Sequence, residues 1–340
     1  MLAFAHRRPA PLSDAHAIEL IERPDPVPGP HDLLVRVRAV SVNPVDVKVR
    51  AGMPLPEGAD ARVLGWDAAG TVLAVGDAVS GFAAGDRVWY AGAIDRPGSH
   101  AERQLVDHRL VGHMPASWGF DDAAALPLTA ITAWELLFDR LGVPRDGGAG
   151  QRLLVVGAAG GVGSVLVQLA RRLTRLEVIG TASRPESAAW VREMGAHHVV
   201  DHSRPLDQAL AEAGLGPVHL VASLTQTEQH YAALVEALAP QGRLALIDDL
   251  AQGLDVRALK RKSLSLHWEM MFTRSLYGTA DMARQGALLD EVAALADAGV
   301  LRSTRARHLG ALGVDTLREA HAQVESGRTV GKIVLGGFPG

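Results

Sequence analysis

The stretch Leu153–Gly163, LLVVGAAGGVG, constrains the fold more than any other part of the sequence. An apolar run that ends in closely spaced glycines predicts a buried parallel strand, a tight turn and the first turn of a helix. The helix expected from Val162 to Leu173 carries four apolar residues on one face: Val165, Leu166, Leu169 and Leu173. The chain is therefore expected to contain a strand, a Gly-rich turn and a helix in succession.

This arrangement is typical of a dinucleotide site. Gly160 and Gly161 let the backbone approach a pyrophosphate, and Gly163 lets the helix pack close to the sheet. Free N–H groups at the helix start, including that of Val162, face the negative charge. The motif reads A-x-G-x-x-G because Ala158 replaces the first glycine, so a Gly-rich loop without a ligand stays an alternative.

The residues that follow strengthen the dinucleotide interpretation. Strands and helices alternate over some hundred residues, which predicts a doubly wound parallel sheet, that is, an α/β Rossmann domain. The expected strands are Glu177–Thr181, His198–Asp201, Val218–Leu224 and Arg243–Asp248, and the expected helices are Pro185–Met194 and Glu228–Leu238.

The first part of the chain, to about Thr129, has a different pattern. Short apolar segments broken by Gly and Pro predict a β-rich, partly open barrel or sandwich. The expected strands are Leu33–Val42, Gly70–Val75, Arg87–Tyr90 and Glu102–Val106. A helical connector is expected over Ala123–Leu137, and the end of the chain predicts helices Asp281–Ala298 and Val314–Ser326 and a strand Lys332–Leu335.

Composition excludes several classes of protein. The 340 residues carry 34 basic and 38 acidic side chains, a net charge of −4, and so show no electrostatic footprint for nucleic acid or an anionic membrane. The absence of cysteine excludes disulfides, thiolate nucleophiles and Cys-based metal sites. No signal peptide and no apolar run of about 20 residues is evident, so we expect a soluble cytoplasmic protein that acts on a small molecule.

Three groups of residues together resemble the medium-chain dehydrogenase/reductase superfamily, in its quinone oxidoreductase-like branch. They are the AAGGVG turn, Asn43-Pro-Val-Asp46, and the series from Gly65-Trp-Asp-Ala-Ala-Gly70 to Val88. Three further segments are similar to a bacterial subgroup known as zinc-type alcohol dehydrogenase-like proteins: Leu126–Trp134, Thr181–Glu186 and His267–Phe272. The resemblance implies a discontinuous GroES-like catalytic domain, residues 1–128 and 273–340, around a Rossmann NADP-binding domain, residues 129–272.

The metal ligands of that superfamily are missing here. In its zinc alcohol dehydrogenases, a Cys at the position of Asn43, a His at that of Trp66 and a second Cys hold the catalytic zinc. Of this constellation only Asp67 remains, and one carboxylate does not make a site. His198 and His202 are the nearest other candidates, but they lack further ligands at a suitable spacing, so we expect no metal.

The cofactor contacts are expected at the ends of the sheet strands. No Asp or Glu occupies the end of the second strand, Thr181 to Arg184, so nothing there repels a 2′-phosphate, and Ser183 and Arg184 can bind one. NADPH is therefore expected, although Glu186 can pair with Arg184. By resemblance Thr132 and Asn43 lie near the nicotinamide, with a helix hydroxyl and an Asn-Pro turn as their alternatives. The remaining expected contacts follow later strands: His202, Ser223, Ile247 and Asp248.

The expected catalytic residues lie around a substrate pocket and comprise Asn43, Asp46, Trp66 and Tyr90, with Met271 and Phe272 beside them. Trp66 offers a flat apolar surface to a conjugated substrate, and Tyr90 is the expected proton donor. Both can instead be core aromatics.

Three functions fit these residues. One is an NADPH-dependent, zinc-independent reductase of quinones or α,β-unsaturated carbonyls. The others are a zinc alcohol dehydrogenase and a non-catalytic nucleotide-binding protein. The apolar run Leu264–Met270 resembles the edge strand through which relatives dimerise, so a homodimer is expected.

Overall fold

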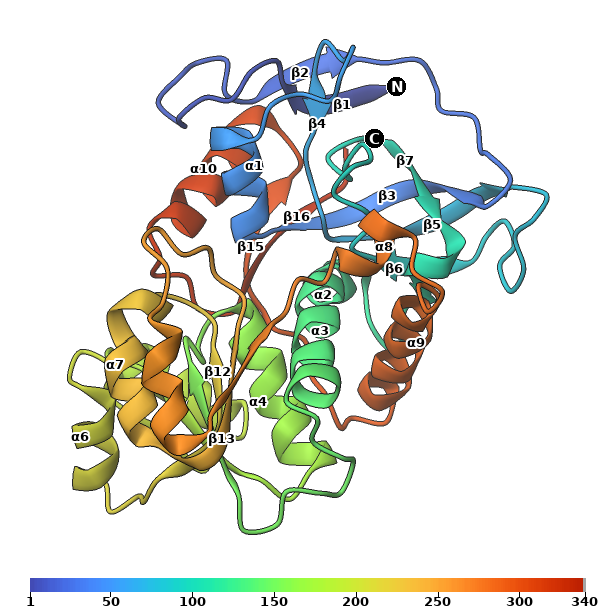
Figure 1. The fold of residues 1–340 in the computed structure, drawn as a ribbon. Helices are drawn as coiled ribbons and strands as arrows, with labels where there is room; N and C mark the ends of the chain where they lie inside the picture. The colour runs from blue at the N-terminus through green and yellow to red at the C-terminus, as the bar shows by residue number, and fades with distance from the viewer. Residues whose placement is uncertain (339–340) are drawn as a thin grey trace. The chain divides into compact units, whose positions relative to one another are not determined.

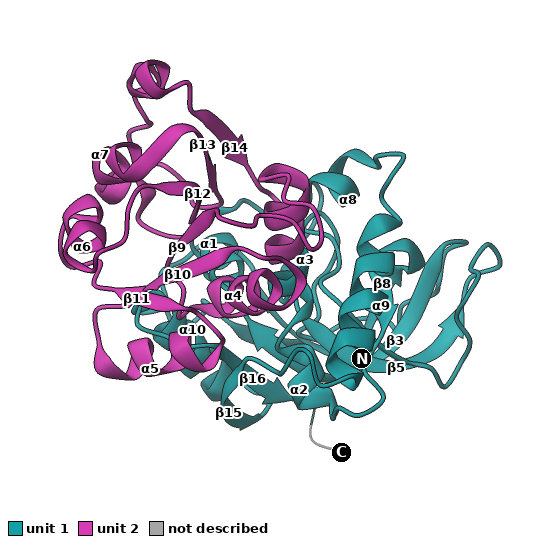
Figure 2. Ribbon diagram, turned by 90° about the horizontal axis from the view of Figure 1, so that it is seen from below, with its two compact units in different colours: residues 1–131, 272–340 teal, residues 132–271 magenta. Residues whose placement is uncertain are grey.

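The computed structural model describes residues 1–338, which form two compact units (Figures 1 and 2). The first unit contains Met1–Ile131 and the chain from Phe272 onward, and the second contains Thr132–Met271. Among the described residues, no helix has both the length and the apolar character that crossing a bilayer requires.

The second unit is built on a six-stranded parallel sheet in the order β11-β10-β9-β12-β13-β14. Its strands are β9 (Arg152–Val156), β10 (Glu177–Thr181), β11 (His198–Val200), β12 (Val218–Ser223), β13 (Leu238–Leu246) and β14 (Ser265–Trp268). Its helices are α4 (Gly161–Leu173), α5 (Pro185–Glu193), α6 (Leu206–Glu212) and α7 (Thr227–Ala237). Figure 2 shows α4 on one side of this sheet and α6 and α7 on the other. The expected doubly wound α/β fold is confirmed.

Burial explains why these strands were recognisable. The residues of β9 from Leu153 to Val156 are buried, because a central parallel strand is covered on both faces. The chain runs from β9 to β10 on one side, then returns to place β12 on the other side of β9. The Gly-rich turn therefore follows the strand at which the sheet order reverses, the usual ligand position in such sheets.

The first unit is β-rich and has two sheets. A three-stranded sheet pairs β2 (Glu19–Glu22), β1 (Leu2–His6) and β4 (Arg62–Val63). The larger sheet has the order β15-β16-β3-β5-β6-β8, with β7 also paired to β3. Its strands are β3 (Asp32–Val42), β5 (Ala68–Val75), β6 (Arg87–Tyr90), β7 (Arg103–Asp107), β8 (Val111–His113), β15 (Arg305–Ala311) and β16 (Lys332–Gly336). The helices are α1 (Pro44–Gly52), α2 (Phe120–Ala124), α8 (Thr273–Tyr277), α9 (Arg284–Asp297) and α10 (Val314–Glu325).

Three elements differ from the sequence-based expectations. The Asn-Pro segment starts helix α1 and is not only a turn, because Pro44 occupies the first helical position and Asn43 the cap. The single expected connector helix is divided into α2, α3 (Pro127–Trp134) and a π-helical turn, Glu135–Arg140. Strand β13 begins at Leu238, and Gln241, with a φ of 66°, interrupts its regular pairing.

The closing strand β16 connects the end of the chain to the start of the first unit. It pairs antiparallel with β3, and Ile333 lies opposite Val42. Helices α1 and α10 also lie side by side (Figure 1), and Arg50 of α1 donates to His321 of α10 over 3.3 Å. This pairing brings Lys332 next to the residues that start α1.

Candidate functional site

The candidate cofactor site lies at the carboxyl edge of the parallel sheet in the second unit. Five strands of this sheet, β9 to β13, each end next to at least one residue expected to contact the cofactor. These residues are Gly160 and Gly161 after β9, Ser183 and Arg184 after β10, His202 after β11, Ser223 at the end of β12, and Ile247 and Asp248 after β13. Parallel strands bring these ends to one edge, so the structure gathers the expected contacts.

The glycines of the turn have different roles. Gly157, which the sequence analysis did not single out, has a φ of +79°, a conformation that favours glycine. A Cβ on Gly163 would lie 2.5 Å from the Gly157 carbonyl oxygen, so α4 packs against the turn only without a side chain there. A Cβ on Gly160 would meet only that oxygen, at 3.5 Å. Gly160 thus keeps open the space at the start of α4, where N–H groups of the first turn lack helical acceptors.

The end of β10 is fixed by Thr181. Its hydroxyl accepts the Gly157 N–H over 3.1 Å and lies 3.2 Å from Nδ1 of His202. Ser183 is exposed and Arg184 half-buried, directly after the strand. Burial lowers the pKa of His202, and the Arg184 guanidinium also lowers it, while Asp201 opposes them. Ser183 and Arg184 follow β10 and His202 follows β11, and no carboxylate occurs between Thr181 and Arg184.

The ends of β12 and β13 are joined by Thr227. The Ser223 hydroxyl lies 2.8 Å from that of Thr227. Asp248 accepts the backbone N–H of Thr227 over 2.9 Å and also its hydroxyl. The Asp248 carboxylate therefore caps the start of α7. Its oxygens already accept hydrogen bonds from Thr227, so it helps to fix the backbone at this edge of the sheet.

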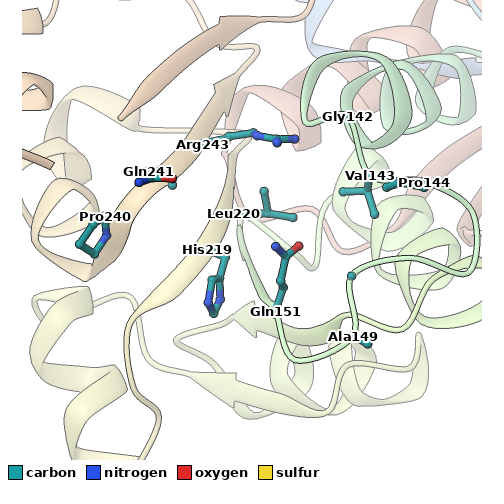
Figure 3. A pocket seen from close by; sticks show the side chains of 12 residues that line it. Gly142, Val143, Pro144, Ala149, Gln151, His219, Leu220, Pro240, Gln241 and Arg243 are labelled. Carbon is teal, nitrogen blue, oxygen red and sulfur yellow. The ribbon is translucent and has the colours of Figure 1, made fainter. Parts of the chain in front are cut away.

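A cavity of about 570 Å³ lies elsewhere in the same unit (Figure 3). Gln151, which precedes β9, His219 near the start of β12 and Arg243 of β13 line it. These residues lie toward the amino ends of β9 and β12 and of the part of β13 that pairs regularly with β12. The Gly-rich turn instead follows the carboxyl end of β9. The cavity is therefore distinct from the candidate cofactor site.

In the first unit, the expected catalytic residues Asn43 and Asp46 belong to a buried polar cluster. The Asn43 amide donates to Asp67 Oδ2 over 2.9 Å, and its Oδ1 accepts from Lys332 Nζ over 2.5 Å. Asp46 Oδ2 accepts the Asn43 backbone N–H over 2.7 Å, at the start of α1. Ser41 also donates to Asp67, over 2.9 Å. We call Ser41, Asn43, Asp46, Asp67 and Lys332 the charge cluster.

The electrostatics of the charge cluster follow from its burial. Lys332 Nζ lies 3.2 Å from Asp67 Oδ2, and both side chains are at most 4% exposed. Burial raises the pKa of Asp46 to about 7 and also raises that of Asp67, whereas the Lys332 ammonium opposes both shifts. Burial lowers the pKa of Lys332 itself. Lys332 is thus the counter-charge of Asp67 within the charge cluster.

The Asn43 side chain is engaged within the charge cluster. Its amide oxygen is held by Lys332, and its amide nitrogen donates to Asp67 and, over 3.4 Å, to the Trp66 carbonyl. With a side chain only 1% exposed, Asn43 has no amide hydrogen left for a ribose or substrate oxygen. It organises the charge cluster instead. Asp46, bound to the backbone of Asn43, is likewise structural here.

Trp66 and Tyr90 are both buried among other side chains of the first unit. Trp66 is fully buried, its indole N–H donates to the Ala93 carbonyl over 3.1 Å, and its ring meets that of Phe272 edge-on at 6.5 Å. Tyr90 is fully buried within the main core cluster of the first unit, and its hydroxyl has no hydrogen-bond partner within residues 1–338. Burial raises the pKa of Tyr90, so this dry phenol does not suit proton donation.

The remaining expected residues are also buried. Thr132 in α3 is 4% exposed, and Met271 and Phe272 are 4% and 5% exposed. Lys332, Ser41 and Gly157 were missed by sequence reasoning. A buried carboxylate such as Asp67 requires a counter-charge, and that requirement is the signal that points to Lys332.

Within residues 1–338, no three His, Asp or Glu side chains come together in a way that would hold a metal ion. His198 contacts Glu177 over 3.0 Å, and His202 contacts Thr181. The two histidines are thus each engaged with a neighbour on β10.

Comparisons with known proteins agree with this fold. Residues 29–125 match the family described as "Alcohol dehydrogenase GroES-like domain", and residues 194–335 match "Zinc-binding dehydrogenase". A zinc-type alcohol dehydrogenase-like protein of Staphylococcus epidermidis is 35% identical, over 98% of this chain and 99% of its own length.

Solved structures extend the comparison. A Rhizobium etli protein, provisionally described as a zinc-dependent alcohol dehydrogenase, is 51% identical with a TM-score of 0.95, over 100% of this chain and 98% of its own. A mycobacterial protein solved with NADPH is 27% identical with a TM-score of 0.83, over the whole of both chains. Quinone oxidoreductases are also among the structures with this fold.

The fold, its Gly-rich turn and these relatives define an oxidoreductase of the medium-chain dehydrogenase/reductase superfamily. Within it, the chain belongs to the family of zinc-type alcohol dehydrogenase-like proteins. The expected superfamily and branch are confirmed.

Proposed function

We propose that this protein is an NADPH-dependent, zinc-independent reductase that transfers a hydride to a quinone or an α,β-unsaturated carbonyl. The residues at two of the zinc-ligand positions carry this proposal, because Asn43 and Trp66 stand where the resemblance places a Cys and a His of related alcohol dehydrogenases. Both side chains are buried and hydrogen-bonded within the first unit. An ammonium, Lys332, supplies positive charge in the cluster instead of a metal.

The second unit fits a nicotinamide cofactor. The open space at Gly160 and the N–H groups at the start of α4 would hold a pyrophosphate. Ser183 and Arg184 would hold a 2′-phosphate, since no carboxylate at the end of β10 repels it. When bound, such a cofactor supplies the hydride, and the protein binds, orients and excludes water.

The burial of Tyr90 favours quinones over enones as substrates. An enone needs a proton at its α carbon as well as the hydride, whereas a quinone that has accepted a hydride takes its proton from water. With the Tyr90 phenol buried, the quinone reaction is the one that needs no proton from that residue. Zinc-dependent alcohol oxidation remains the second candidate, because relatives carry that description.

We expect NADPH turnover with quinones to exceed turnover with enones, and purified protein to contain no stoichiometric zinc. Elemental analysis and a panel of quinones, enones and simple alcohols provide the measurement. One tightly bound zinc per chain, together with alcohol oxidation that a chelator abolishes, would favour the second candidate.

We also propose a homodimer formed through β14. Among residues 1–338, this strand pairs only with β13 and lies at the edge of the sheet, while Trp268 and Met270 are 52% and 49% exposed. An exposed apolar edge favours pairing with a second copy.

Light scattering is expected to give twice the 35.9 kDa mass of the chain. Trp268→Asp should shift this mass toward the monomer, whereas the control Val256→Asp, an exposed apolar position outside β14, should not. A monomeric wild type at all concentrations would contradict the proposed dimer.

A further inference from the structure

Two hydrogen bonds in series connect helix α5 to the Gly-rich turn. The Trp190 indole N–H donates to the Ser164 hydroxyl over 2.8 Å. That hydroxyl lies 2.7 Å from the Gly160 carbonyl oxygen and 3.5 Å from the Ala159 carbonyl oxygen, so its single hydrogen is donated to Gly160. Gly160 is the cap residue of α4. We call Trp190, Ser164 and Gly160 the turn link, and the proposed function assigns no role to the first two.

The turn link is more than a contact within one helix. A serine hydroxyl in a helix commonly bonds to the carbonyl four residues earlier, and on its own this bond joins α4 only to itself. Ser164 is fully buried, and the hydrogen bond that it accepts comes from another helix. An indole N–H can only donate, so Trp190 is the donor at this contact. The bond therefore fixes α5 relative to the start of α4.

Apolar packing brings the same two segments together. Figure 2 shows α4 and α5 on the same side of the sheet. A Cβ on Gly180 of β10 would clash with Val191 of α5 and would lie 3.0 Å from the Cβ of Ala158 in the turn. The Val191 and Ala158 side chains are completely buried. Helix α5 and the turn thus pack on one glycine, where they leave no room for a side chain.

Helix α5 also carries Arg184 at its start. Arg184 is the cap residue, Pro185 occupies the first helical position, and the Ala188 N–H donates to the Arg184 carbonyl over 2.9 Å. Trp190 follows Arg184 by six residues, about 9 Å along the helix axis. One short helix therefore holds both the residue proposed to bind the 2′-phosphate and the residue that is bonded to the proposed pyrophosphate turn.

We propose that Trp190 is a positioning residue that favours NADPH over NADH. Through Ser164 it holds α5 where Arg184 and the Gly-rich turn bind the 2′-phosphate and the pyrophosphate of one cofactor molecule. Ordering α5 in advance removes a cost that NADPH would otherwise meet on binding. NADH carries no 2′-phosphate, so it gains less from a fixed α5. This role in cofactor selection rests on the proposed function, whereas the hold of Trp190 on the turn does not.

Amide hydrogen exchange of the chain without cofactor tests the turn link by itself. Trp190→Phe keeps an aromatic ring but removes the N–H, and it should lower the protection of residues 158–164 and 186–191 by about three- to ten-fold. Ser164→Ala, which removes the acceptor, should have the same effect. The control Trp118→Phe, at a half-buried tryptophan of the first unit, should leave both segments unchanged. Unchanged exchange in Trp190→Phe or in Ser164→Ala would overturn the turn link.

Calorimetric titration of NADPH and NADH tests the selection. Trp190→Phe should weaken NADPH binding by about five- to ten-fold and NADH binding by less than about two-fold, whereas Trp118→Phe should leave both within about two-fold of the wild type. In an Arg184→Ala background, Trp190→Phe should change NADPH binding by less than about two-fold, because the phosphate contact that it positions is already absent. A purely structural tryptophan would weaken binding of both cofactors equally and in both backgrounds, and that result would overturn the role in selection.

The two measurements distinguish failure of this role from failure of the proposed function. A wild type that binds NADPH, combined with altered exchange but unaltered cofactor preference in Trp190→Phe, would overturn the role in selection alone. A wild type that binds neither cofactor would overturn the proposed function and the role in selection with it. Altered exchange in Trp190→Phe would then still support the turn link.

Discussion

Lys332→Met is expected to destabilise the first unit by about 3 to 5 kcal/mol, because it leaves the Asp67 carboxylate buried without its counter-charge. Lys332 Nζ contacts Asp67, the Asn43 amide oxygen and, over 2.9 Å, the Val42 carbonyl. The variant therefore loses an ion pair and two hydrogen bonds at once. Urea unfolding at pH 7 measures the change.

Two further variants distinguish the loss of the ion pair from the loss of packing as the cause of the destabilisation. Asp67→Asn combined with Lys332→Met removes both charges and should recover a large part of the lost stability. Lys260→Met, at an exposed lysine, should change the free energy of unfolding by less than about 0.5 kcal/mol. If Lys332→Met lies within about 1 kcal/mol of wild type, the charge cluster does not hold the unit together as argued.

Arg184→Ala is expected to weaken NADPH binding by about ten- to a hundred-fold and to leave NADH binding nearly unchanged. Charged hydrogen bonds contribute about 1.5 to 3 kcal/mol, and only NADPH carries the 2′-phosphate. Titration of both cofactors against the wild type and the variant is the measurement.

The control for this effect is Arg192→Ala, which removes an exposed arginine from the same region, on α5. It should leave both affinities within about two-fold of the wild type, since it has no part in the proposed phosphate site. Equal losses of NADH and NADPH in Arg184→Ala, or a wild-type preference for NADH, would show that the end of β10 does not distinguish the two cofactors.

The sequence predicted the parallel sheet well because its strands are continuous apolar runs between glycines and prolines. The expected bounds of β10, Glu177–Thr181, are those of the structure. The same reasoning located the Gly-rich turn, but it emphasised Gly160 and overlooked Gly157, whose backbone makes the turn. The motif contains several glycines, and the sequence does not show which of them adopts the positive φ.

The first unit was harder to predict because its site depends on residues far apart in the sequence. Asn43 and Lys332 are 289 positions apart and meet only because β16 pairs with β3. Without that contact, Asn43 has a free amide and becomes a candidate ligand, as the resemblance implied. For Trp66 and Tyr90 the sequence left two interpretations open, because it does not distinguish an aromatic side chain that lines a pocket from one that fills a core.

We expect hydride transfer by this protein to need NADPH and no zinc. The rate of NADPH oxidation with a quinone is measured on one preparation before and after exhaustive chelation, with zinc content determined on the same samples. The rate should be unchanged at less than about 0.1 zinc per chain, since the chain has no thiolate to bind the metal. A rate that disappears on chelation and returns with one zinc per chain would contradict it.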